Sequence, residues 1–155
     1  MDPLDPLRIR LEVDALNAEF AWLIDHDQSH LVAALFTEDG AYGRSTGQWA
    51  RGREAIAETY RQRVAHGERT TRHLFSNLRL QPPEDRLVKG TVILTLYGED
   101  GKPPHPAVPL VIADYDDIYQ LCDDGRWRYR ERLITWFFKR EGATSPLRLG
   151  AAGGG

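Results

Sequence analysis

The sequence predicts an α+β domain in which helices cover one face of a curved, mostly antiparallel sheet. Apolar residues recur at helical spacing before Gly67, and the period changes to two after it. Turn sequences such as Asp123-Asp124-Gly125 then divide the chain at short intervals, which is typical of strands joined by hairpins. Helices followed by hairpin-connected strands favour two layers around one core.

Three helices are expected in the N-terminal half. Residues 7–26 carry apolar side chains, from Ile9 to Ile24, at the spacing of an amphipathic helix. Residues 28–36 fit a short second helix, and Ser29 is a suitable cap near its start. A turn and a short strand at residues 41–44 come before the third helix at residues 52–65.

Four long strands are expected to follow, at residues 72–80, 87–97, 106–121 and 127–139. Several are apolar on both faces. In the first, Phe75 points one way while Leu74 and Leu78 point the other way. One face of such a sheet can cover the helices, and the other needs a partner. We therefore expect a homo-oligomer, either a dimer or a trimer.

Length and composition exclude several classes of protein. The 155 residues fit one domain, placed at residues 1–140, with a flexible, glycine-ended tail at residues 141–155. Twenty basic and 23 acidic residues without a basic stripe argue against nucleic acid as a partner. No apolar run is long enough to cross a membrane, and the start lacks the features of a secretory signal. With the lone Cys122, these features predict a cytoplasmic protein.

Four short motifs carry a resemblance to a known family. They are residues 20–27 (FAWLIDHD), 35–42 (LFTEDGAY) with 52–56 (GREAI), 71–77 (TRHLFSN), and 114–117 (DYDD) with 125–129 (GRWRY). In this order and spacing they are similar to the motifs of the SnoaL-like superfamily, which shares its fold with scytalone dehydratase and nuclear transport factor two. The resemblance implies a cone-shaped α+β barrel, with three N-terminal helices packed in the concave face of the sheet.

The resemblance also implies a catalytic dyad. In dehydratases of this superfamily, an aspartate at the end of the first helix pairs with a histidine on the strand after the third helix. By position these residues are similar to Asp25 and His73, and a tyrosine after the second helix is similar to Tyr42. Asp27 is a rival carboxylate, but it lies about 200° further round a helix, so both cannot face one pocket equally.

Aromatic and polar residues near this dyad are candidates for substrate binding. The high aromatic content suits an apolar pocket for a ring-containing ligand. The residues expected to bind the substrate are Phe20, Trp22, Tyr60, Phe75, Asn77, Tyr115, Arg132 and Trp136. Strand alternation places Phe75 and Asn77 on the same side as His73, where they would line an enclosed pocket. Phe20 occupies the position at which bile acid dehydratases carry a tyrosine, so the resemblance to those enzymes is incomplete.

The resemblance implies a cofactor-independent lyase of the dehydratase type, or an isomerase, that acts on a small hydrophobic cyclic or aromatic molecule. His73 would abstract a proton, Asp25 would orient its ring, and Tyr42 would stabilise the enolate oxygen. Elimination, isomerisation and hydrolysis all remain open. No cofactor or metal is expected: His26 and His30 have the spacing of helical metal ligands, but no third ligand group accompanies them.

Two alternatives do not require catalysis. The same cone could serve as a binding module for an apolar ligand. It could also be a structural subunit, like the β subunits of ring-hydroxylating dioxygenases, which share this fold and have a stretch similar to Arg72-His73-x-x-x-Asn77. Ligand affinity that survives the loss of His73 would favour the first alternative, and a large iron–sulfur partner subunit would favour the second.

Overall fold

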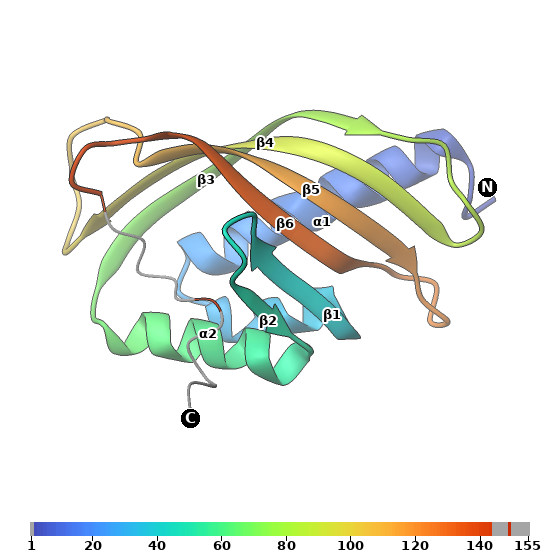
Figure 1. Cartoon of the computed structure of the whole chain (residues 1–155), viewed down its shortest axis with the longest axis horizontal. Helices are drawn as coiled ribbons and strands as arrows, with labels where there is room; N and C mark the ends of the chain where they lie inside the picture. Colours follow the sequence, from blue (N-terminus) through green and yellow to red (C-terminus); the bar gives the residue numbers. More distant parts are fainter. Residues whose placement is uncertain (1, 144–148, 150–155) are drawn as a thin grey trace.

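Six strands form one curved sheet, and the helices lie inside its curve (Figure 1). The computed structural model describes residues 2–143 and residue 149. The elements are α1 (Pro6–Asp25), η1 (Ser29–Leu35), β1 (Phe36–Arg44), β2 (Trp49–Arg51), α2 (Arg53–Ala65), β3 (Arg69–Leu80), β4 (Leu87–Asp100), β5 (Val111–Leu121) and β6 (Trp127–Lys139). The strand order is β2-β1-β6-β5-β4-β3. The sheet is open, with β2 and β3 at its edges, so the α+β cone is present without closure into a barrel.

Helix α1 is defined by its cap and its apolar stripe. The Asp5 carboxylate accepts hydrogen bonds from the backbone N–H groups of Leu7 and Arg8, at 3.0 and 3.2 Å, and Pro6 occupies the first turn. The buried stripe faces β3 and β6 and consists of Ile9, Val13, Leu16, Phe20 and Leu23. The helix ends at Asp25. The side chain of this last residue is hydrogen-bonded to β3 of the sheet.

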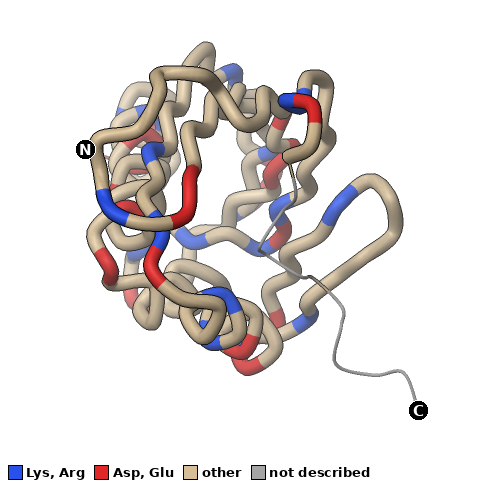
Figure 2. The backbone as a smooth tube through the Cα atoms, turned by 90° about the vertical axis from the view of Figure 1, so that its left-hand side faces the viewer, with Lys and Arg blue, Asp and Glu red and all other residues tan. Residues whose placement is uncertain are grey.

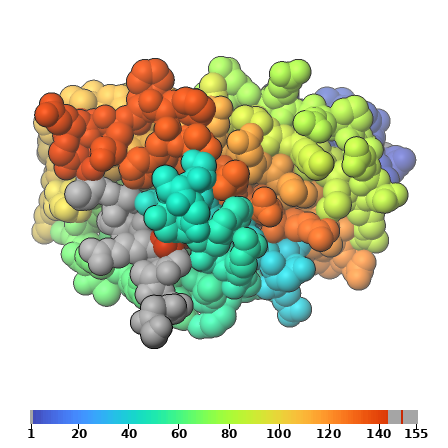
Figure 3. All heavy atoms as spheres, in the orientation of Figure 1, coloured from blue at the N-terminus to red at the C-terminus, as the bar shows by residue number. Residues whose placement is uncertain are grey.

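The N-terminal half differs from the expected elements in three ways. The second helix is a 3-10 helix, and the short strand expected at residues 41–44 is the end of a longer strand, β1. Gly47, with a φ of 101°, allows the chain to turn back into β2, a strand that was not expected. β1 also runs parallel to β6, with Tyr42 opposite Arg132, whereas all other strand pairs are antiparallel. In the space-filling view the atoms of β1 and β2 (cyan) lie directly against β6 (Figure 3).

The four long strands were expected, but their starts and alternation were only partly correct. β3 begins at Arg69, and its register with β4 shifts between Ser76 and Arg79. Asn77 has a φ of 55° at this bulge, which reverses the alternation beyond it. Leu74 is consequently 50% exposed while Leu78 is buried. The expectation that Leu74 and Leu78 share a face is therefore wrong.

A single apolar cluster fills the space between the helices and the concave face of the sheet. The predicted tail, residues 141–155, lies mostly outside the described residues; of those that are described, Leu149 is buried in this cluster. In the described part of the chain, basic and acidic residues are interspersed along the backbone (Figure 2). Within the described residues, none of the helices combines the length and apolar character that crossing a membrane requires.

Candidate active site

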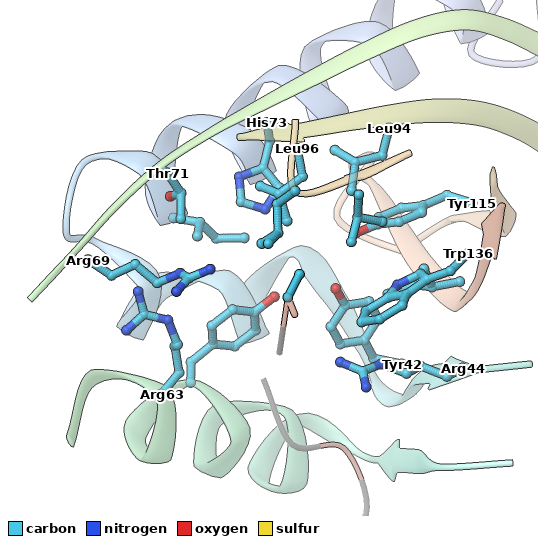
Figure 4. Close-up of a pocket in the computed structure, with 16 residues that line it drawn as sticks. Tyr42, Arg44, Arg63, Arg69, Thr71, His73, Leu94, Leu96, Tyr115 and Trp136 are labelled. Carbon is cyan, nitrogen blue, oxygen red and sulfur yellow. The ribbon is translucent and has the colours of Figure 1, made fainter. Parts of the chain in front are cut away.

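A cavity of about 80 Å³ lies between α2, β1 and the inner face of β3, β4, β5 and β6 (Figure 4). This volume is several times the roughly 10–15 Å³ that one water molecule needs. Much of its wall is apolar, formed by Ile24, Leu94, Leu96, Leu110, Val111, Ile134, Trp136 and Ala143. Polar atoms cover a smaller part of the wall, and they come from eight residues: Tyr42, Tyr60, Tyr115, Thr71, His73, Arg44, Arg63 and Arg69. An apolar space with a few converging polar groups is typical of a small-molecule site.

Asp25 and His73 lie in contact at the wall of this cavity. His73 Nδ1 is 2.6 Å from Asp25 Oδ1, and the His73 backbone N–H donates to Asp25 Oδ2 at 2.8 Å. The Thr71 hydroxyl donates to Oδ1 at 2.8 Å, so two β3 residues hold the carboxylate. The side chains of His73 and Asp25 are only 9% and 5% exposed. Asp27 lies beyond the end of α1, with a φ of 59°, and is exposed.

The surroundings of Asp25 keep its carboxylate ionised. Burial alone would raise the pKa of the Asp25 carboxyl, but the hydrogen bonds and charge of His73, together with the Thr71 hydroxyl, lower this pKa below its usual value. An ionised carboxylate can only accept, so Nδ1 of His73 carries a proton and donates it to Asp25. In the neutral imidazole this leaves Nε2 as the basic nitrogen.

Three tyrosines face the histidine from other elements. Tyr42 comes from β1, Tyr60 from α2 and Tyr115 from β5, and all three are buried. The Tyr60 hydroxyl has no hydrogen-bond partner among the described residues. Burial, together with the neighbouring Tyr42, raises the pKa values of Tyr60 and Tyr115 well above that of a free tyrosine. The hydroxyls of Tyr60 and Tyr115 therefore stay protonated and can donate to a ligand.

Phe20, Phe75 and Arg132, expected to bind substrate, lie behind the cavity wall. The Phe20 ring packs edge-on against Tyr42, His73 and Phe75. Arg132 is fully buried and makes two 2.8 Å hydrogen bonds to the Asp117 carboxylate and one of 2.6 Å to Asn17. Its guanidinium lies 4.0–5.1 Å from the ring centres of Phe20, Phe75, Tyr115 and Tyr129. These three residues support the wall from behind.

Trp22 and Asn77 lie in a different place from the cavity. Both line an open groove between α1 and β3. There Trp22 is 55% exposed, and its ring stacks on the ring of His26 with 3.7 Å between the ring centres. The bulge in β3 removes Asn77 from the inner face that carries His73 and Phe75. Of the eleven residues expected at the site, the cavity is lined by Tyr42, Tyr60, His73, Tyr115 and Trp136, with Asp25 directly behind His73.

Sequence reasoning missed Thr71, Arg63 and Arg69. Arg69 and Thr71 stand four and two residues before His73, so strand alternation places all three on one face. Arg63 follows Tyr60 by three positions on α2, a spacing that puts both on one side of a helix. Within the described part of the chain, His, Cys, Asp and Glu side chains form no group of three that could hold a metal ion.

Solved structures with the same architecture come from several bacteria. A scytalone dehydratase-like protein from Novosphingobium aromaticivorans has a TM-score of 0.78 at 18% identity, covering 99% of this chain and 100% of its own. ActVI-ORFA from Streptomyces coelicolor has a TM-score of 0.72 at 20% identity, covering 83% and 97%. The β subunit of an aromatic-ring-hydroxylating dioxygenase-like protein from Novosphingobium aromaticivorans has a TM-score of 0.71 at 16% identity, covering 83% and 89%.

These likenesses establish the fold alone, because identities below 25% do not carry a function from one protein to another. Among curated proteins, no sequence matches this chain. Family comparison is more direct, since the SnoaL-like domain matches residues 5–133, which is most of the described structure. The match includes the end of α1, β3 and the start of β6, and therefore both members of the Asp25–His73 pair. The chain belongs to the SnoaL-like family.

Proposed function

We propose that this protein is a cofactor-independent lyase of the dehydratase type, or an isomerase, acting on a small hydrophobic cyclic or aromatic substrate. The observation that carries the proposal is the 2.6 Å contact between His73 Nδ1 and Asp25 Oδ1 at the wall of an apolar cavity. A histidine oriented by a buried carboxylate is a general base suited to neutral pH. The family includes dehydratases and cyclases, and the scytalone dehydratase-like neighbour has the same fold.

In the proposed mechanism Nε2 of His73 takes a proton from a carbon next to a carbonyl group. The C–H electrons form a new C=C bond, and the resulting enolate oxygen accepts a hydrogen bond from the Tyr42 hydroxyl. The ionised Asp25 carboxylate stabilises the imidazolium that forms. In a dehydration the C–O bond then breaks, and the leaving hydroxyl takes the imidazolium proton and departs as water. In an isomerisation the proton returns to a different carbon.

Proton abstraction can be measured before the natural substrate is identified. Proton NMR in deuterium oxide would follow hydrogen exchange next to the carbonyl of 1-tetralone, and fluorescence would follow water loss from 3-hydroxy-1-tetralone to 1-naphthol. His73→Gln and Asp25→Asn should slow a catalysed rate by about 100-fold or more. His66→Gln, at the exposed end of α2, is a matched control that should keep the wild-type rate. Wild-type rates in both dyad variants would contradict the proposal.

A binding module is the second candidate, and the largely apolar wall of the cavity supports it. It requires that 1-tetralone bind while neither exchange nor water loss exceeds the uncatalysed rate. Affinity for the ligand would then survive His73→Gln. The third candidate, a structural subunit, rests on fold likeness to the dioxygenase-type β subunit. It requires co-purification with a larger iron–sulfur protein.

We also propose that the outer face of the sheet is an interface between copies of this chain, forming a dimer or trimer in the cytoplasm. Leu74 pairs with Thr95, Thr95 with Ile112, and Ile112 with Phe138, so these side chains form one row across β3, β4, β5 and β6. Leu74 and Phe138 at its ends are 50% and 68% exposed. An exposed apolar row of this kind is typical of a contact surface.

A further inference from the structure

Two arginines from different elements meet at one end of the cavity. Arg63 lies on α2, and Arg69 is the first residue of β3. Their guanidinium groups lie side by side in the close-up view (Figure 4). Arg69, Thr71 and His73 follow one another on the inner face of β3. Along a strand, four residues span about 13 Å. The backbone positions of Arg69 and His73 are therefore about 13 Å apart, and both side chains line the same cavity.

The carboxylates nearest to these two cations, Asp27 and Asp100, are both exposed to solvent. Arg69 Nη1 donates to Asp100 Oδ1 at 2.8 Å, but the Asp100 side chain is 86% exposed, so water screens this pair. Arg63 makes no ion pair with any described carboxylate, and its hydrogen bond is a long one of 3.5 Å to the carbonyl oxygen of Gly67. Burial and the charge of Arg69 lower the pKa of Arg63, and the exposed carboxylates of Asp100 and Asp27 only partly oppose this shift. Guanidinium groups placed together in this way favour a bound anion.

The chain leaves room for this arrangement. Gly98 of β4 lies opposite Thr71, and a Cβ at this position would come within 2.9 Å of Arg69 Nη2. The Arg69 side chain is only 7% exposed, so it lies in the cavity wall rather than in solvent. Close by, the buried Tyr60 hydroxyl also lacks a hydrogen-bond partner among the described residues. Donors from α2 and β3 thus converge here, and their protein acceptors are the exposed Asp100 carboxylate and the Gly67 carbonyl oxygen.

We propose that the substrate of this site carries a carboxylate, which binds between Arg63 and Arg69 while the apolar ring lies toward Trp136. This inference rests on the proposed function, because it assigns one end of the substrate of the Asp25–His73 site. A carboxylate matches the planar, forked donors of a guanidinium and accepts two hydrogen bonds from each. It also anchors the molecule so that its remaining carbons lie beside His73.

The test compares two probes that differ only in charge. Titrations of 3-phenylpropanoate and 3-phenylpropanamide, followed by two-dimensional amide NMR, give a dissociation constant for each. We expect the carboxylate to bind about tenfold more tightly than the amide, and Arg63→Gln or Arg69→Gln to remove most of this preference. Arg61→Gln, on the exposed face of the same helix, is the matched control and should retain it. Arg69→Lys keeps the charge, and should keep part of the preference even if Arg69→Gln folds poorly.

Equal affinity for the two probes, no binding of either, or a preference that persists without both arginines would overturn the inference. Tighter binding of 2-phenylethyl phosphate than of 3-phenylpropanoate would overturn the assignment to a carboxylate. His73→Gln separates this inference from the proposed function. If the arginines hold the carboxylate, this variant keeps the preference although it loses proton abstraction. A loss of the preference in His73→Gln would instead place the carboxylate on the imidazole.

Discussion

Asp25 receives two hydrogen bonds from the same residue, because the Nδ1 of His73 lies 2.6 Å from Oδ1 and the His73 backbone N–H lies 2.8 Å from Oδ2. The carboxylate therefore fixes both the ring and the backbone of the histidine. It also joins the last residue of α1 to β3, which is an edge strand of the sheet. One carboxylate thus has two duties: it orients the proposed base, and it attaches the helix to the strand.

The second duty predicts how stability depends on pH. The pKa of Asp25 is lowered from 3.8 in the folded protein by the hydrogen bonds and charge of His73, which outweigh the effect of burial. A lowered pKa means that the unfolded chain binds the proton more tightly. The stabilisation by Asp25 is therefore full above the unfolded pKa and is lost as the pH falls through the folded pKa. The melting temperatures of wild type and Asp25→Asn, measured by thermal unfolding, should therefore approach each other as the pH is lowered from about 6 to about 2. A constant difference in melting temperature over this range would contradict the prediction.

Removing the Tyr60 hydroxyl should not reduce stability. This hydroxyl is buried without a partner among the described residues, whereas the Tyr129 hydroxyl donates to Asn17 Oδ1 at 2.7 Å. Tyr60→Phe should therefore leave the free energy of unfolding unchanged or slightly raised. Tyr129→Phe should lower it by about 0.5–1.5 kcal/mol, because Asn17 Oδ1 keeps only its hydrogen bond from Arg132. Urea unfolding measures both variants. Equal losses in the two would show that Tyr60 also has a partner in the folded protein.

Arg132 is expected to be essential for folding rather than for substrate contact. It is fully buried and paired with Asp117, whose side chain is also fully buried. Arg132→Met would leave the Asp117 charge buried and uncompensated, which should cost about 3–5 kcal/mol of unfolding free energy. Arg61→Met, which breaks the exposed ion pairs with Glu54 and Glu58, should cost far less, because solvent screens these pairs. Comparable losses in the two variants, measured by urea unfolding, would contradict this role.

The apolar row on the outer face of the sheet leads to a separate prediction about oligomer assembly. Phe138→Glu places a charge at one end of the row and should convert the proposed oligomer to a monomer, because burying an unpaired carboxylate is unfavourable. Light scattering coupled to size-exclusion chromatography gives the mass. Val64→Glu is the matched control, since Val64 is 62% exposed but belongs to α2. A monomeric wild type, or an oligomer that persists in Phe138→Glu, would exclude this surface as the interface.

Local patterns in the sequence were sufficient for most of the fold. Helical spacing identifies α1, and alternation between turn sequences identifies β3, β4, β5 and β6. The motif FAWLIDHD with the later His73 pointed to the dyad through family resemblance. These features depend on neighbouring residues or on short motifs, so a single sequence contains them.

Other features follow from contacts between distant parts of the chain. The parallel pairing of β1 with β6 joins residues far apart in sequence, and the bulge at Asn77 depends on the register with β4. The bulge decides that Asn77 lines the groove on the other side of Asp25 and His73 rather than the cavity, and the end of α1 decides that Asp25 rather than Asp27 meets His73. Only the tertiary structure brings Arg63 of α2 beside Arg69 of β3. The sequence determined α1, α2 and the four long strands, because periodicity is local, but it did not indicate β2. Packing decided which side chains share the cavity, because a contact between two side chains depends on how their two elements are placed relative to each other.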